Sequence, residues 1–237
     1  MATGNNTWPE GWQALASLDP KPGDVQMVAI YGREGVNHCA LLTANHQPVS
    51  QPGHCSLDAF QQWHKATRIP VHEFHVVDEA AWFPAGWVDQ ANDWMNPLGD
   101  GPWSRQLIDD GMELIHQTAI APDTSMPLMA SNANRWLKAK QGNAVQVYRH
   151  GNYLEVAVIE DGKITMHNHN HASSSHDVAY LIMLAYDQCT LAPESIPMRW
   201  EGDPDLATWT VLEQFVHQVQ RDGSDAWQAY KVMLNQA

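Results

Sequence analysis

One order of strands and helices occurs twice along this chain, and it constrains the fold more than any other feature. The second half predicts three successive strands joined by short turns, at Ala144–Arg149, Tyr153–Glu160 and Lys163–Asn170. A helix, a further strand and a further helix follow. Residues 25–77 repeat this order less clearly. Because a chain of two β-β-β-α-β-α units usually closes a cleft between its halves, the turns facing that cleft are the first candidates for a functional site.

Apolar periodicity places the other elements. Alternation predicts strands at Asp24–Tyr31, Asn37–Thr43, Ile69–Val77 and Ile196–Trp200. Helical spacing predicts helices after Ser56, over Pro84–Met95, within Met126–Lys140, over His176–Cys189, after Asp203 and over Ser224–Leu234. The segment Gln106–Ile115 fits either a strand or a short helix. In the helix after Asp203, the side chains expected to point inward are Leu206, Trp209, Leu212, Phe215 and Val216.

Composition supports one folded unit with two lobes and excludes some partners. Apolar residues make up 44% of the 237 residues, which is enough for a core, and no Pro/Ser linker separates the halves. We divide the chain into a lead-in (1–23), a first lobe (24–130) and a second lobe with a C-terminal helix (131–237). Thirteen basic against 27 acidic residues give a formal charge of −14. This charge argues against nucleic acid or an anionic membrane as partner, because both attract Lys and Arg.

Sequence features also predict a cytoplasmic location. The first residues show no basic region followed by an apolar stretch, so we expect no secretory signal. No apolar run approaches the ~20 residues that span a bilayer. The three cysteines, Cys39, Cys55 and Cys189, are far apart, which is typical of a reducing compartment and not of a disulfide framework.

Four stretches of the second half carry a resemblance to a known family. They are Tyr153–Lys163, Asn168, Asp177–Tyr180 and Leu191–Gly202. Together they resemble DUF3822, a bacterial family of unknown function whose fold is similar to that of the actin-like ATPases. The resemblance implies an α/β protein with mixed sheets, built from two ribonuclease H-like lobes. This implied architecture agrees with the two β-β-β-α-β-α units read from the residues.

The turns that hold phosphate in an actin-like ATPase are altered here. Such a turn usually carries Asp, then Gly, then small hydroxyl residues, because these position the metal-bound water and the phosphates. The corresponding turns are Ile30–Asn37 and Val147–Tyr153, and neither has that Asp or a Gly-Thr run. The adenosine-side turn, Trp200–Pro204, has one Gly between two carboxylates. Hydrolysis of Mg-ATP is therefore disfavoured, and no cofactor is expected.

The altered turns still supply candidate ligands for the cleft. They are Tyr31, Gly32, Arg33, Gly35, Arg149, His150, Gly151, Asn152 and Gly202. In one interpretation Arg33, Arg149 and His150 face the cleft and hold an anion other than ATP. In the other, both turns are ordinary hairpins with solvated arginines.

Three histidines alternate along the third strand of the second lobe. Period-2 spacing puts His167, His169 and His171 on one face, about 6–7 Å apart per step. Imidazoles on one face could bind zinc or another transition metal. The alternative is a solvated polar strand at a sheet edge, with Asn168 and Asn170 on the other face.

The function predicted first is a non-catalytic module that binds a protein partner or acts as a scaffold. The altered phosphate turns favour it, and so do four tryptophans that could form a docking patch, Trp82, Trp87, Trp94 and Trp103. The alternatives are nucleotide or anion binding in the cleft, and metal binding by the three histidines.

Overall fold

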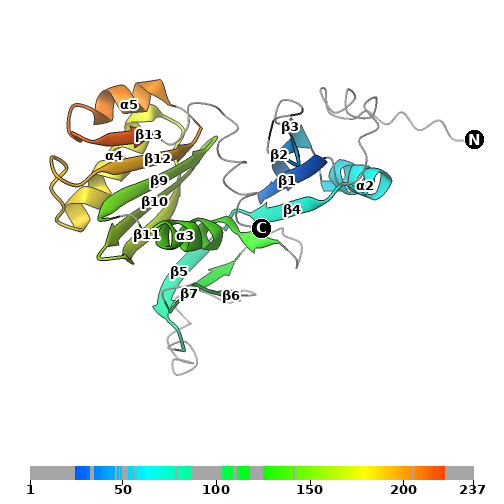
Figure 1. Cartoon of the computed structure of the whole chain (residues 1–237), viewed down its shortest axis with the longest axis horizontal. Coiled ribbons are helices and arrows are strands. Elements are labelled where there is room, and N and C mark those ends of the chain that lie inside the picture. Colours follow the sequence, from blue (N-terminus) through cyan, green and yellow to red (C-terminus); the bar gives the residue numbers. More distant parts are fainter. Residues whose placement is uncertain are drawn as a thin grey trace, which may run out of the picture.

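The fold is mixed α/β, with three sheets whose strands belong to two lobes and a smaller insertion (Figure 1). The computed structural model describes residues 25–32, 35–45, 47, 49, 53–55, 57–77, 79–86, 103–108, 111–117, 125–140, 142–203 and 205–221. The lead-in, Arg33 and the helix expected over Ser224–Leu234 lie outside these residues.

The first lobe is a five-stranded sheet in the order β3-β2-β1-β4-β8. Its strands are β1 (Val25–Gly32), β2 (Gly35–Thr43), β3 (Gly53–Cys55), β4 (Val71–His75) and β8 (Met126–Pro127). Strands β1, β2 and β3 are antiparallel neighbours, whereas β4 and β8 run parallel to β1. Helix α2 (Leu57–Thr67) connects β3 to β4 and buries Phe60 and Trp63, as its apolar spacing predicts.

The second lobe repeats this topology strand for strand, in the order β11-β10-β9-β12-β13. Its strands are β9 (Ala144–His150), β10 (Tyr153–Glu160), β11 (Lys163–His171), β12 (Met198–Gly202) and β13 (Val219–Arg221). Helix α4 (Ser175–Gln188) connects β11 to β12, and α5 (Leu206–Leu212) connects β12 to β13. The duplication predicted from the sequence is confirmed. The lobe boundaries stay a prediction, and residues on both sides of position 130 lie in one helix, α3 (Leu128–Lys138).

A third sheet is inserted between β4 and β8, and the sequence did not predict it. Its order is β5-β7-β6, with β5 at Glu79–Pro84, β7 at Met112–Gln117 and β6 at Ser104–Leu107. The helix expected to start at Pro84 is wrong at its start, because Pro84 ends β5 and a turn with Gly86 at φ +75° follows. Proline suits an edge strand, where its missing N–H is not needed. Residues 87–95 lie outside the described residues.

The segment Gln106–Ile115 forms parts of two strands, so the helix alternative is wrong. A turn breaks it, with Gly111 at φ +81°. Helix α5 starts later than expected, after Asp205, whose Oδ1 accepts a hydrogen bond from the Thr208 N–H at 2.9 Å. Two of the side chains expected inward are exposed, Leu206 at 72% and Phe215 at 50%. Leu206 is in the first turn, and Phe215 follows the helix end, so neither is held against the sheet.

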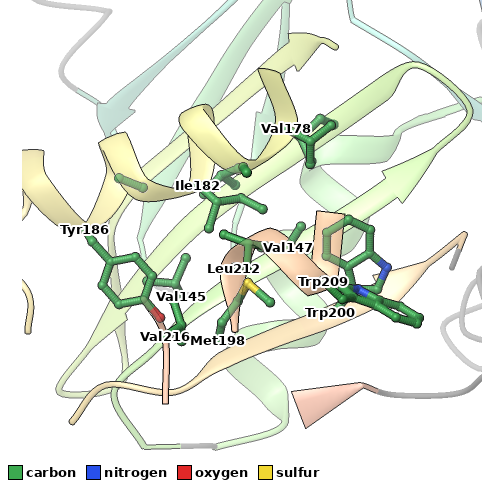
Figure 2. Packing of buried hydrophobic residues seen from close by; sticks show 14 of the residues in the cluster. Val145, Val147, Val178, Ile182, Tyr186, Met198, Trp200, Trp209, Leu212 and Val216 are labelled. Atoms are coloured by element: carbon green, nitrogen blue, oxygen red, sulfur yellow. The ribbon is translucent and has the colours of Figure 1, made fainter. Parts of the chain in front are cut away.

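The best-defined core lies between the second sheet and its two helices (Figure 2). Valines of β9 face Val178, Ile182 and Tyr186 of α4, while Trp200 and Trp209 meet edge to face with ring centroids 5.8 Å apart. A second cluster joins the inner faces of both large sheets to α3. Its members are Val28, Ile30, Ala40, Leu42, Phe74, Leu128, Trp136, Tyr148, Tyr153, Ala157 and Ile159. The lobes are therefore packed together through apolar side chains.

Candidate functional site

Four of the predicted cleft residues come together where β9 and β12 end. Gly202 lies opposite Arg149 in the parallel ladder, and the Asp203 N–H donates to the Arg149 carbonyl at 2.8 Å. The Gly151 N–H donates to Asp203 Oδ2 at 2.7 Å, and His150 Nδ1 lies 3.4 Å from the same oxygen. One carboxylate of the chain thus caps the turn that would hold phosphate in an active ATPase.

The glycine at position 202 is required by this packing. Its φ of +90° is a conformation that L side chains rarely adopt, and an added Cβ would lie 2.0 Å from the Arg149 carbonyl oxygen. The contact that needs glycine is therefore one between two strands of the chain itself.

Arg149, the candidate cation of the turn, is paired inside the protein. Its Nη1 donates to Asp205 Oδ2, and its Nε donates to the Gly151 carbonyl at 3.1 Å. The guanidinium is 13% exposed; this burial lowers its pKa, and the charge of Asp203 opposes the lowering. Asp205 is in turn held by Thr208. The turn therefore carries two carboxylates and one arginine, so it has no net positive charge to offer an anion. Asn152 is exposed at the tip.

In the first lobe Arg33 lies outside the described residues, and the candidates that the structure describes there are Tyr31, Gly32 and Gly35. Tyr31 is buried in the core under α2, where its hydroxyl donates to Glu73 Oε1 at 2.5 Å and its ring meets Phe60 edge to face. The expectation that Tyr31 faces the cleft is wrong, because it lies on the β1 face opposite to that of Val28 and Ile30. Gly32 and Gly35 pair with each other at the end of the β1–β2 hairpin.

A buried polar network occupies the inner face of the second sheet, and the sequence reasoning missed it. At its centre is Glu155, which is fully buried. It accepts hydrogen bonds from the Tyr153 hydroxyl at 2.6 Å and from Asn132 Nδ2 at 3.0 Å, and His167 Nε2 lies 3.1 Å away. Burial, followed by the charge of Glu155, raises the pKa of Tyr153 well above its usual range. The signal was present, since a glutamate inside the apolar run of β10 is rarely buried without partners.

Helix α3 extends this network across β9 to strand β12. Arg135 forms an ion pair with Glu201, and its Nη2 also donates to Asn132 Oδ1 at 3.0 Å. The Trp136 indole N–H donates to Glu201 Oε2 at 3.2 Å. Figure 1 shows α3 lying beside the second sheet, towards the first lobe. Side chains of α3 thus contact both buried glutamates of the second sheet, Glu155 and Glu201.

The three histidines share one face of β11, as predicted, and β11 is an edge strand of its sheet. They are not equivalent. His167 is buried and stacks on Trp82 with ring centroids 5.0 Å apart, whereas His169 and His171 lie near the Tyr153 ring. The solvated-strand alternative is therefore wrong for His167. Among the residues that the structure describes, no three His, Cys, Asp or Glu side chains gather as a metal site.

Comparison with known proteins defines the class of this chain. The sequence model of DUF3822, described as a protein of unknown function, matches residues 116–219 and confirms the resemblance over those residues. A Bacteroides thetaiotaomicron protein described as having an actin-like ATPase fold and unknown function superposes with a TM-score of 0.58 at 10% identity, over 89% of this chain and 96% of that one. The fold is therefore that of the actin-like ATPases.

A second solved structure shows the same fold. The cytoplasmic domain of EpsL, an inner membrane component of the type II secretion system of Vibrio cholerae, superposes with a TM-score of 0.52 at 11% identity. The match covers 90% of this chain and 94% of that domain. No curated protein matches in sequence. Within the described residues, none of the helices combines the length and the apolar character that crossing a lipid bilayer needs.

Proposed function

We propose that this protein is a non-catalytic member of the actin-like fold, and that its ligand is another protein. The observation that carries the proposal is the pairing of Arg149 with Asp205, beside a turn capped by Asp203. A triphosphate entering this turn would have to separate that ion pair and lie against two carboxylates. Neither step is favourable, because an unpaired charge in a poorly solvated site is costly.

The inner face of the second sheet supports the same conclusion. Glu155 and Glu201 are buried there, and their partners come from the chain itself: Asn132, Arg135 and Trp136 of α3. The chain-wide charge of −14 adds a further repulsion of anions. In this proposal the two lobes serve to present surfaces that a partner protein recognises.

A thermal-shift experiment tests this proposal. The full chain is heated with Mg-ATP, Mg-ADP or zinc, and we expect no change in Tm with any of them. A ligand that binds only the native state would add about 2.7 kcal/mol at a concentration of 100 times its Kd, so binding would be visible. The proposal fails if Mg-ATP raises Tm and Arg149→Ala removes the effect while Arg199→Ala, at a half-buried arginine on the adjoining strand β12, leaves it intact.

A further inference from the structure

A small pocket lies between the inserted sheet and the second lobe. It has a volume of about 210 Å³ and is lined by Trp82 and Met112 on one side and by residues 164–168 of β11 on the other. Trp82 belongs to β5, and in the part of the chain that the structure describes, β5 and β11 are both edge strands. The pocket therefore opens between two sheet edges whose outer backbone groups no described strand pairs.

A bulge in β11 lies in the wall of the pocket. Val158 faces Met166 and Ile159 faces Ile164 across the ladder, so Thr165 is the extra residue with none opposite it. As a result Ile164 and His167 both lie on the inner face, three positions apart, and Trp82 stacks on His167.

The size and lining of the pocket suit one side chain. Pockets for drug-sized ligands measure roughly 300–1,000 Å³, so 210 Å³ is too little for a nucleotide. Its apolar walls include Met112, Met166 and Trp82. Methionines adapt their shape to an inserted group, and pockets with such walls receive the aromatic or large aliphatic anchors that dominate protein interfaces.

Charged residues beside the pocket indicate which residues should flank the inserted side chain in the partner. Glu160 accepts a hydrogen bond from the Thr165 hydroxyl at 2.9 Å, and Asp161 follows it in the β10–β11 turn. Lys163 is the single basic residue of that turn region, and over the whole chain 27 acidic residues face 13 basic ones. A segment with Lys or Arg beside its anchor is attracted to this end of the pocket, whereas an acidic segment is repelled.

We propose that this β5/β11 pocket is the docking site for an extended segment of another protein, which inserts one aromatic or large aliphatic side chain next to Trp82 and carries basic residues beside it. This inference rests on the proposed function and identifies the surface to which the partner protein binds. In the part of the chain that the structure describes, no strand pairs the outer edge of β11, so an extended segment can add there as a further strand.

Selection of random peptides displayed on phage, with the full chain as bait, tests the docking site. We expect the enriched peptides to share one aromatic or large aliphatic residue with Lys or Arg nearby. A synthetic peptide of the enriched sequence should bind Thr165→Lys and Asn168→Lys at least tenfold more weakly than the unchanged chain. Both positions are exposed at the pocket, so the variants fold. Thr210→Lys, an exposed position on α5, carries the same change of charge and should bind as the unchanged chain does.

The outcomes separate this inference from the proposed function. If no peptide is enriched, if the enriched peptides are acidic, or if Thr165→Lys binds as well as Thr210→Lys, the docking site is overturned. Peptides that bind elsewhere on the chain would still leave the protein-binding function in place. Stabilisation by Mg-ATP that depends on Arg149 would instead overturn the function itself.

Discussion

The two large sheets have the same strand order but different inner faces. In the first lobe the inner face of β1 and β2 is apolar, with Val28, Ile30, Ala40 and Leu42. In the second lobe the corresponding strands β9 and β10 bury Gln146, Tyr148, Tyr153 and Glu155. The strand order needs only buried apolar area and hydrogen-bonded ladders, which both lobes supply. The two copies of a duplicated fold can therefore share a strand order while one of them has polar side chains on its inner face, with hydrogen-bond partners from the same chain.

Among the substitutions that test this comparison, the largest effect is expected from the replacement of Glu155. Replacing it with Ala leaves Asn132, Tyr153 and His167 without their shared acceptor, and each buried polar group left without a partner costs about 1–3 kcal/mol. Urea denaturation measures the loss. A double-mutant cycle with His167→Ala should show strong coupling, and simple additivity of the two changes would show that the network contributes nothing as a unit.

The first lobe should respond to acid through His75 and His116, which are buried with ring centroids 5.3 Å apart. Burial, and then the charge of His116, lowers the pKa of His75 from 6.5 to about 4, and burial lowers the pKa of His116. The folded state therefore binds fewer protons than the unfolded state, and this stability is present above pH 6.5 and lost as pH falls towards 4. For His75 the loss is about 2 kcal/mol at pH 5.

The check is denaturation at several pH values for the unchanged chain and for His75→Leu. The variant should lose less stability between pH 7 and pH 5, because it has one fewer group to protonate. If the stability of the two proteins depended on pH in the same way, the assignment of this acid sensitivity to His75 would be wrong.

A glycine substitution tests the packing of the second-lobe turn. Gly202→Ala should destabilise the fold by about 2–3 kcal/mol, because it combines a strained φ with a clash against the Arg149 carbonyl. Gly142→Ala is the matched control, since an added Cβ there meets nothing within 4 Å. Equal stability of the two variants would mean that the turn relaxes and that the Arg149–Gly202 contact is not fixed.

A smaller effect than at Glu155 is expected from Arg135, which is 16% exposed and therefore partly screened by water. Arg135→Met should cost about 1.5–3 kcal/mol, the range for hydrogen bonds to charged groups, because Trp136 still donates to Glu201. The melting temperature measures it. A variant more stable than the unchanged chain would show that the ion pair costs more in desolvation than it returns.

Much of this fold could be predicted from the residues, since period-2 alternation and Gly-containing turns fix strand order locally. The sequence does not predict which face of a strand points towards the other lobe. Strand β1 is buried on both sides, so alternation does not say whether Tyr31 or Ile30 faces the other lobe. The inserted sheet was missed because its strand β5 pairs with β7 about thirty residues later, and Pro84 is as typical of a helix start as of a strand edge.

The candidate site was predicted in part. Four of its residues do lie together, Arg149, His150, Gly151 and Gly202, because the turn after β9 and the end of β12 lie at the same end of these two neighbouring strands. Their partners, Asp203 and Asp205, are one and three residues beyond the end of β12, and sequence spacing does not tell a capping carboxylate from a solvated one. The β5/β11 pocket lies beside a bulge at Thr165, and no residue pattern in β11 predicts this bulge.

The measurement closest to the central claim is titration calorimetry of the full chain with Mg-ATP, repeated with Arg149→Ala. The account predicts no saturable heat for the unchanged chain up to about 1 mM, which corresponds to a binding free energy weaker than about −4 kcal/mol. Saturable binding to the unchanged chain that disappears in Arg149→Ala would contradict it, because the arginine would then be serving a nucleotide and not Asp205.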